Sequence, residues 1–128
     1  ALCLDWMRDP ATALAFSASD DEARQAGLQL AAWCGKRAVE LRDRPGLVVF
    51  RTLCQLANGA ADAVRDEVAD ADAIDRAMIN GVNYPFGPMA WAREHGFVRV
   101  ATALDAIADA TDDNSYNPCE IFRAGDED

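Results

Sequence analysis

The sequence has few of the residues that metal sites and catalytic sites require. Its 128 residues include one histidine, His95, and four cysteines that form no Cys-x-x-Cys pair. Zinc sites usually combine such pairs with each other or with histidines, so we expect no metal site. The cysteines, at positions 3, 34, 54 and 119, have apolar neighbours. We therefore expect small buried side chains in a reducing compartment, the cytoplasm.

Glycine is present, but not in the arrangement that binds a dinucleotide. The eight glycines never occur as Gly-x-Gly-x-x-Gly, the pattern that lets backbone N–H groups approach a pyrophosphate at a helix N-terminus. We therefore expect no cofactor-binding residue in this chain. His95 precedes Gly96 at an expected helix end, where histidine usually complements the helix dipole. We do not interpret it as a catalytic base.

Clustered positive charge and long apolar runs are also missing. The chain has 12 basic and 22 acidic residues, which gives a net charge of −10. Because nucleic-acid binding needs a basic patch, we expect no nucleic-acid partner. No apolar run approaches the roughly 18 residues of a membrane span, so we expect no membrane partner either. With 51% hydrophobic residues, the chain can still bury one core.

Three short segments near the N-terminus are candidate strands, and the first and third show the alternation typical of a half-buried strand. They cover residues 2–7, 12–17 and 37–43, with a turn at Asp9-Pro10. The spacing of Ser19 and Glu22 fits a capping box and predicts a helix to about residue 34. The expected core side of that helix carries Ala23, Leu28, Leu30 and Trp33. We interpret residues 1–44 as a β-β-α-β remnant of an α/β domain.

From Pro45 onward the apolar spacing becomes helical. A regular apolar repeat predicts one long helix over residues 48–68, with small residues at 57–63 that let another helix approach closely. That second helix could belong to the same chain or to another molecule. Further helices are expected over residues 72–81, 88–95, 97–111 and 118–123, with a loop at 112–115. The chain is therefore predicted to be mainly α, with about five helices in residues 45–128.

The most distinctive pattern is a helix, a turn and a second helix within residues 72–96. Asp72 is the expected cap of the first helix, and a second carboxylate follows three residues later. Asn80-Gly81 is typical of a helix end in the left-handed conformation. Pro88 follows a proline- and glycine-rich turn and fits the first position of the second helix.

This pattern and residues 45–51 (PGLVVFR) resemble the C-terminal helical domain of the 3-hydroxyacyl-CoA dehydrogenases. That family typically opens the domain with Pro-Gly-aromatic-aliphatic-aliphatic-Asn-Arg, and later shows an Asp-Ile-Asp-x-Ala-Met helix and a Gly-x-x-x-Pro-x-Gly-Pro turn. The resemblance covers about residues 37–123 and is strongest to bacterial members that handle hydroxybutyryl- or hydroxyadipyl-type thioesters. It implies a helical domain similar to the C-terminal domain of 6-phosphogluconate dehydrogenase.

The resemblance also implies where the chemistry lies. In the family, a His–Glu pair and the NAD site belong to the N-terminal domain, and the Asn of the opening run orients the substrate oxygen. The matching position here is Phe50, which neither donates nor accepts a hydrogen bond. We therefore assign no catalytic residue, and expect Asn58, two turns later, to be a surface or packing amide.

The expected protein is thus the second, non-catalytic copy of two tandem helical domains within a longer NAD-dependent enzyme. That enzyme would oxidise 3-hydroxyacyl-CoA to 3-oxoacyl-CoA in fatty-acid or aromatic-acid catabolism, and this piece alone would be inactive. Two other functions remain open: a ligand-free helical association module, and a subunit that is active only with a separate nucleotide-binding chain. We expect a homodimer through the long helix, because an uncovered apolar face favours association.

Five residues are candidates for shaping the acyl-CoA cleft, by analogy with the family. They are Phe50, Arg51, Tyr84, Phe86 and Trp91. For the aromatic side chains, packing in the core is the alternative role. For Arg51, the alternative to a contact with a CoA phosphate is a solvated or ion-paired side chain.

Overall fold

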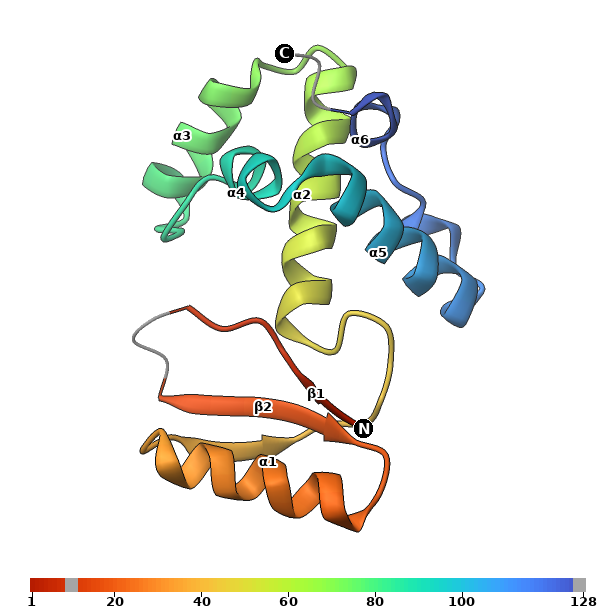
Figure 1. Ribbon diagram of the computed structural model, residues 1–128. Coiled ribbons are helices and arrows are strands. Elements are labelled where there is room, and N and C mark those ends of the chain that lie inside the picture. The colour runs from red at the N-terminus through yellow and green to blue at the C-terminus, as the bar shows by residue number, and fades with distance from the viewer. Residues whose placement is uncertain (9–11, 126–128) are drawn as a thin grey trace. The chain divides into compact units, whose positions relative to one another are not determined.

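The computed structural model describes residues 1–8 and 12–125 (Figure 1), so the turn expected at Asp9-Pro10 lies outside the described residues. The chain divides into two compact units, which we call unit 1 (Ala1–Arg51) and unit 2 (Thr52–Asp128). Unit 1 contains β1 (Leu2–Leu4), β2 (Ala13–Ala18), α1 (Asp21–Trp33) and β3 (Arg37–Glu40). The predicted β-β-α-β order is therefore present.

Helix α2 (Val49–Arg65) begins in unit 1 and continues into unit 2. Unit 2 also contains α3 (Ala71–Gly81), α4 (Pro88–His95), α5 (Phe97–Thr111), the 3-10 turn η1 (Asn114–Tyr116) and α6 (Glu120–Ala124). Residues 45–125 thus hold five α-helices, as predicted. In the described part of the chain, no helix combines the length and the apolar character needed to cross a membrane.

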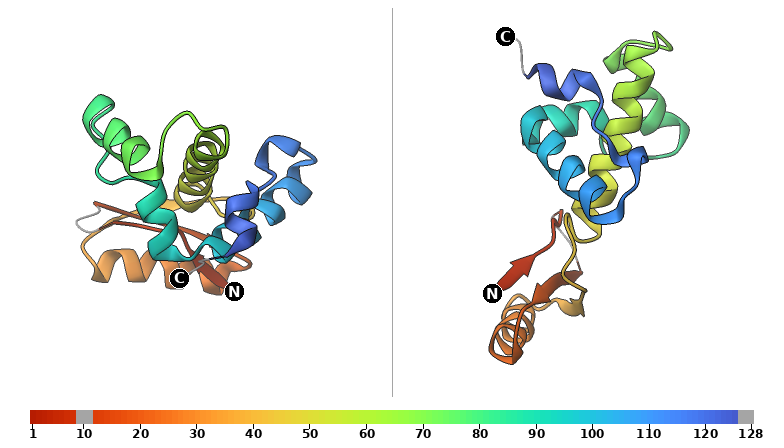
Figure 2. Two further views of the ribbon diagram at one scale, coloured as in Figure 1. Left: turned by 90° about the horizontal axis from the view of Figure 1, so that it is seen from above. Right: turned by 90° about the vertical axis from the view of Figure 1, so that its right-hand side faces the viewer.

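Unit 1 is a three-stranded sheet with one face covered by α1 (Figures 1 and 2). Strand β1 runs antiparallel to β2, and β3 runs parallel to β2 after the crossover through α1. Leu14 and Phe16 of β2 form a core with Ala31 of α1. Gly27 of α1 packs directly on this core, because a Cβ atom there would lie 2.5 Å from the Phe16 ring.

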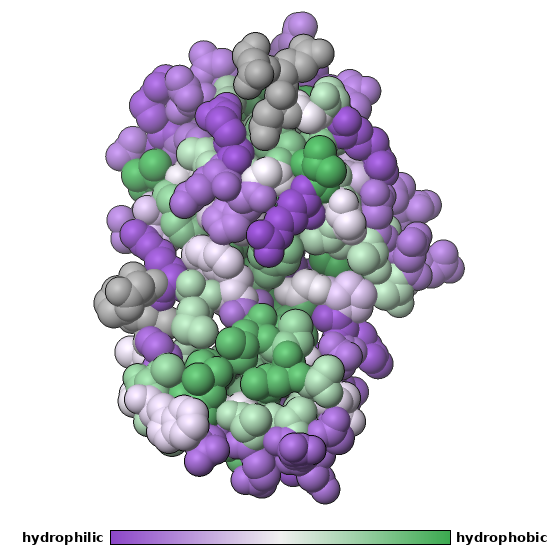
Figure 3. Space-filling model, viewed as in Figure 1, coloured by the Kyte–Doolittle hydropathy of each residue, from purple (hydrophilic) through white to green (hydrophobic). Residues whose placement is uncertain are grey.

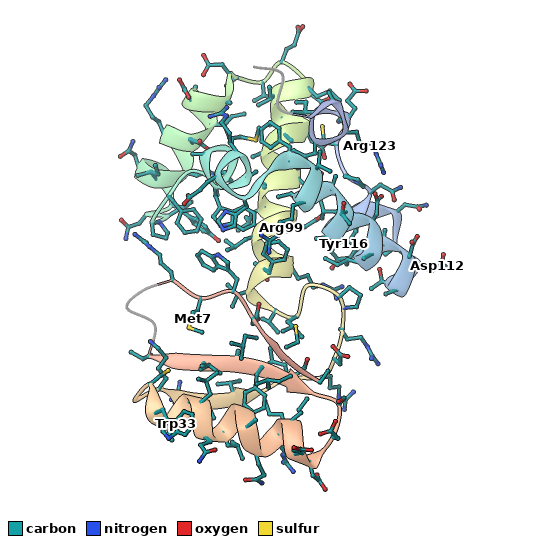
Figure 4. All side chains as sticks on the ribbon, in the orientation of Figure 1. Met7, Trp33, Arg99, Asp112, Tyr116 and Arg123 are labelled. Atoms are coloured by element: carbon teal, nitrogen blue, oxygen red, sulfur yellow. The ribbon has the colours of Figure 1, made fainter. Side chains whose placement is uncertain are left out.

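Two expectations for α1 were wrong. Trp33 is 77% exposed and lies at the surface (Figure 4), because the small residues Gly27 and Ala31 form the side that meets the sheet. Leu28, the next residue to Gly27, is also exposed. The N-cap is Asp20 rather than Ser19, because the Ser19 hydroxyl donates to the Asp20 carboxylate, which itself accepts the N–H of Ala23.

Unit 2 has its core where the apolar repeat of α5 predicted it. Four residues of that repeat are buried: Phe97, Val100, Leu104 and Ile107. Helix α5 lies against α6 and η1, and the Phe97 ring meets the Phe122 ring of α6 with a centroid distance of 5.2 Å. In α2, Ala57 and Ala61 are fully buried. The small-residue face of α2 is therefore covered within the described chain.

The boundaries of α3 differ from the prediction at both ends. The cap is Asp70, whose carboxylate accepts the N–H of Ala73 at 2.7 Å, and not Asp72. Gly81 remains helical, and the left-handed residue is Asn83, with φ 56°. This conformation lets the N–H of Tyr84 return to the Met78 carbonyl at 3.1 Å, and asparagine adopts it more readily than most residues.

Three other expectations were only partly correct. Cys54 and Cys119 are buried as expected, whereas Cys3 and Cys34 are exposed. The long helix ends at Arg65 rather than near residue 68. The expected loop at 112–115 instead contains the start of η1, because the Asp113 carboxylate caps this turn by accepting the N–H of Ser115 at 2.9 Å.

Candidate functional site

The five candidate residues fall into two groups that belong to different units. Phe50 and Arg51 lie in the first turn of α2 and belong to unit 1. Tyr84 and Phe86 lie between α3 and α4, and Trp91 lies in α4, all in unit 2.

The first turn of α2 is held by a carboxylate from a distant part of the sequence. The backbone N–H groups of Val48 and Val49 donate to Oδ2 of Asp5 at 3.0 and 2.8 Å. The N–H of Phe50 donates to Oδ1 at 3.2 Å. Asp5 follows β1 and is only 5% exposed. Its role was missed from the sequence, because a cap 43 to 45 residues away leaves no local pattern.

The chain enters α2 through an unusual turn. Gly46 and Leu47 both have positive φ angles, 73° and 48°, and a leucine in this region is uncommon. The N–H of Leu47 donates to the Arg44 carbonyl at 3.0 Å, and the N–H of Arg51 donates to the Gly46 carbonyl at 2.9 Å. Phe50 is half-buried at the position that matches the family's Asn, and its side chain offers no polar atom there.

In unit 2, Asp75 caps α4 in the same way. Its carboxylate accepts the N–H groups of Met89 at 2.8 Å and Ala90 at 2.9 Å. Gly87 gives it room, because a Cβ atom at Gly87 would overlap the Asp75 side chain. Pro88 is the first residue of α4, as predicted. The pattern of an Asp followed by Gly-Pro therefore describes one cap, which sequence reasoning did not recognise.

The three aromatic candidates of unit 2 differ in exposure. Tyr84 and Phe86 are half-buried and meet edge to face, with ring centroids 6.1 Å apart. Trp91 is 3% exposed, and its ring stacks on that of His95 at 4.5 Å. His95 lies in the last turn of α4, where we expected it, and its Nδ1 is 2.9 Å from the Trp91 carbonyl oxygen.

The parallel unit β2–α1–β3 is the arrangement that binds dinucleotides in nucleotide-binding folds, where a phosphate sits at the helix N-terminus. Here Asp20 caps that N-terminus. Hydrogen bonds from the Ser19 hydroxyl and the Ala23 N–H lower the pKa of Asp20 to about 2. An ionised carboxylate thus stands where the phosphate would bind, and Asp21 and Glu22 follow it. These residues do not fit a dinucleotide cofactor.

Cys54 and Asn58 are two further buried groups in unit 2. Burial raises the pKa of the Cys54 thiol to about 12, against a smaller opposing effect of Arg99, so this thiol is neutral and a poor nucleophile. Asn58 is 2% exposed. Its amide donates to the Asn117 carbonyl at 3.0 Å and accepts the N–H of Cys119 at 2.8 Å, so it is a packing amide. The described residues contain no cluster suited to a metal ion.

Among protein families, the chain matches a model described as 3-hydroxyacyl-CoA dehydrogenase, C-terminal domain, over residues 46–126. Among curated proteins, the 3-hydroxyadipyl-CoA dehydrogenase of Escherichia coli is 33% identical over 88% of this chain and 24% of its own length. The probable 3-hydroxybutyryl-CoA dehydrogenase of Bacillus subtilis is 35% identical over 83% of this chain and 37% of its own. The chain therefore spans well under half the length of these relatives.

Solved structures give the same result. The crystal structure of 3-hydroxybutyryl-CoA dehydrogenase from Escherichia coli matches 96% of this chain and 26% of its own, with 29% identity and a TM-score of 0.86. That of (S)-3-hydroxybutyryl-CoA dehydrogenase from Ralstonia eutropha matches 90% of this chain and 42% of its own, with 25% identity and a TM-score of 0.78. Both matches extend beyond the helical residues into unit 1.

Proposed function

Because the chain belongs to the family of 3-hydroxyacyl-CoA dehydrogenase C-terminal domains, we propose that it serves as the helical domain of an NAD-dependent dehydrogenase. The proposed reaction is the oxidation of 3-hydroxyacyl-CoA to 3-oxoacyl-CoA, in fatty-acid or aromatic-acid catabolism. The family match over residues 46–126 carries this proposal. It is supported by relatives and structural neighbours that are named as dehydrogenases of hydroxybutyryl- or hydroxyadipyl-CoA.

In this proposal the chain shapes the substrate cleft and does not carry out hydride transfer. Phe50 replaces the polar residue that would orient the substrate oxygen, and Asp20 stands at the helix end where a phosphate would bind. NAD would be held by a complete nucleotide-binding domain elsewhere in the enzyme, and residues 1–44 would be a degenerate fragment of a second such fold. Tyr84 and Phe86 are the aromatic candidates for the acyl end of the cleft, because both are half-buried.

The first experiment is an activity assay of the 128-residue chain with acetoacetyl-CoA and NADH. We expect no NADH oxidation above the blank, with the Escherichia coli 3-hydroxyadipyl-CoA dehydrogenase as the positive control. The Phe50→Asn variant should be equally inactive, because the nucleotide site and the His–Glu pair are still missing. Turnover by the chain alone would contradict the proposal. Activity that arises only on mixing with a separate nucleotide-binding chain would favour the alternative of a two-chain enzyme.

The second experiment tests the positive part of the proposal. The matching segment of the Escherichia coli 3-hydroxybutyryl-CoA dehydrogenase is replaced by this chain, and kcat and KM are measured for the hybrid. We expect a folded hybrid with activity, because the two backbones agree over 96% of this chain. A hybrid that folds but has lost all activity would show that this chain cannot serve as the domain.

We also propose that the chain pairs through its helical domain in the cytoplasm, without a membrane or nucleic-acid partner. Apolar residues reach the molecular surface among polar ones (Figure 3). In unit 2 these include Ile79 and Val82 at the end of α3, and Val98 on α5. Light scattering should give a dimer mass that falls toward the monomer in Val82→Glu, while the control Gln29→Glu in α1 keeps the wild-type mass. A monomer at every concentration would contradict pairing.

A further inference from the structure

We infer that Asp5 is a positioning residue: its carboxylate holds the first turn of α2, the turn that carries Phe50. Residues 1–7 then supply a part that the helical domain needs, although the family match begins only at residue 46. The inference does not depend on the proposed activity. It concerns how the backbone at position 50 is fixed, whatever side chain stands there.

The start of α2 needs an outside acceptor because its own sequence provides none. The first N–H groups of any helix have no carbonyl partner within the helix. Ser, Thr, Asp or Asn usually supplies a local acceptor, but here Leu47 and Val48 precede the helix. Three consecutive N–H groups at this entry, of Val48, Val49 and Phe50, donate instead to Asp5.

The Asp5 carboxylate satisfies these donors with both oxygens. Oδ2 accepts the N–H groups of Val48 and Val49. Oδ1 accepts the N–H of Phe50 and, at 2.8 Å, that of Trp6. Negative charge at a helix N-terminus is favoured by the helix dipole, and hydrogen bonds to a carboxylate are stronger than those to a neutral acceptor. Burial of Asp5 further excludes the water that could replace it.

The turn before α2 requires the hydrogen bonds from Asp5 because it contains a residue in an unfavourable backbone conformation. Leu47 has a φ of 48°, and such a conformation persists in a branched residue only where the surroundings fix it. The N–H of the next residue, Val48, is bound to Asp5. Release of the carboxylate would therefore free Leu47 to return to an ordinary backbone conformation, and the first turn of α2 would open with it.

An amide cannot replace the carboxylate in this position. Each Asp5 oxygen accepts two N–H groups. In Asp5→Asn, whichever way the amide turns, its NH2 group faces two donors and accepts neither. We therefore expect Asp5→Asn to disrupt the first turn of α2 almost as much as Asp5→Ala, even though asparagine has nearly the same volume as aspartate.

The test is amide hydrogen exchange of the whole 128-residue chain, read residue by residue by NMR. In Asp5→Ala and Asp5→Asn, the N–H groups of Val48, Val49 and Phe50 should exchange at least about tenfold faster than in the wild type. The control is Asp20→Ala, which also removes a capping carboxylate: it should affect the start of α1 and the contact with the Ala1 ammonium, and leave the three amides of α2 protected. Wild-type protection of the three amides in a folded Asp5→Ala would overturn the inference.

A rescue experiment separates positioning from a general loss of stability. Removal of the Asp5 side chain leaves a space lined by N–H donors, which formate can occupy as a free carboxylate. Formate should restore protection of the three amides in Asp5→Ala, and chloride at equal ionic strength should not. Equal effects of both salts would contradict a specific carboxylate site. If Asp5→Ala does not fold, the exchange result of Asp5→Asn decides, with Asp20→Asn as its control.

Discussion

The two units of the chain differ strongly in net charge, yet in each of them a carboxylate distant in sequence caps a helix. Unit 1 has seven acidic and seven basic residues, whereas unit 2 has fifteen acidic and five basic residues. The whole net charge of −10 therefore lies in unit 2. In each unit, a carboxylate from another element caps a helix that follows a Pro-Gly or Gly-Pro turn: Asp5 caps α2, and Asp75 caps α4. We call these two side chains remote caps.

The difference between the units shows that a cap depends on local donors and not on net charge. Asp75 accepts two N–H groups within a strongly acidic unit, and Asp5 accepts four within a neutral one. Asp75 reaches only 14 or 15 residues along the chain, whereas Asp5 reaches more than 40 to α2. Because Asp5 directly follows β1, the start of α2 can be capped only after β1 has taken its place in the sheet.

The largest expected loss of stability comes from adding a Cβ atom at the two glycines that pack closely against a neighbouring side chain. Gly27→Ala in unit 1 would press on the Phe16 ring, and Gly87→Ala in unit 2 would press on Asp75. Each should lower the free energy of unfolding by about 1–3 kcal/mol, as measured by urea denaturation. The control is Gly59→Ala in α2, where a Cβ atom meets open space; it should stabilise by about 0.5–1 kcal/mol. Unchanged stability in Gly87→Ala would show that Asp75 moves freely.

The next effect compares the two remote caps directly. Asp5→Ala should cost about 2 kcal/mol of unfolding free energy and Asp75→Ala about 1 kcal/mol, because Asp5 satisfies more donors and is more deeply buried. Urea denaturation followed by circular dichroism measures both values. Equal losses would mean that the two additional donors of Asp5 add nothing.

A smaller effect should follow from the unequal charge of the units. Raising the ionic strength from about 0.05 M to about 0.5 M screens repulsion between exposed acidic residues. Unit 2 should gain up to about 1 kcal/mol, and unit 1 should change little. Hydrogen exchange at Val100 in the core of unit 2 and at Phe16 in the core of unit 1 would report each separately. An equal gain at both sites would contradict the charge comparison.

The smallest effect concerns acid stability at the α1 cap. The Ser19 hydroxyl and the Ala23 N–H lower the pKa of Asp20 from 3.8 to about 2 in the folded state. Its stabilising contribution is therefore complete above roughly pH 4 and is lost as the pH falls through about 2. Asp20→Asn should remove this pH dependence of α1 in circular dichroism, whereas the neighbouring exposed Asp21→Asn should retain it.

The sequence predicted elements well where one periodic signal dominated. The repeat of Phe97, Val100, Leu104 and Ile107 located α5 and its buried side. Boundaries were less accurate where two carboxylates competed, since Asp70 and Asp72 both fit a cap and only the bond to Ala73 decides between them. Trp33 was placed in the core because it is large and apolar, although Ala31 and Gly27 occupy the side that meets the sheet.

The candidate site could be predicted only as far as the family motifs reach. They identified position 50 and the turn with Tyr84 and Phe86, and the roles of those side chains in a cleft remain predictions. The remote caps could not be found in this way. Asp5 looked like one polar residue in a strand, and Asp75 like an ordinary first-turn carboxylate, because hydrogen bonds to backbone donors leave no mark on the partner's sequence.

The Asp20 cap has one more consequence. A helix N-terminus beside parallel strands attracts an anion, and in this chain the anion is covalently part of the protein. In the β2–α1–β3 unit, the Asp20 carboxylate therefore occupies the position at which the phosphate of a nucleotide would otherwise bind. An external phosphate would have to displace a carboxylate that is covalently tethered at this position.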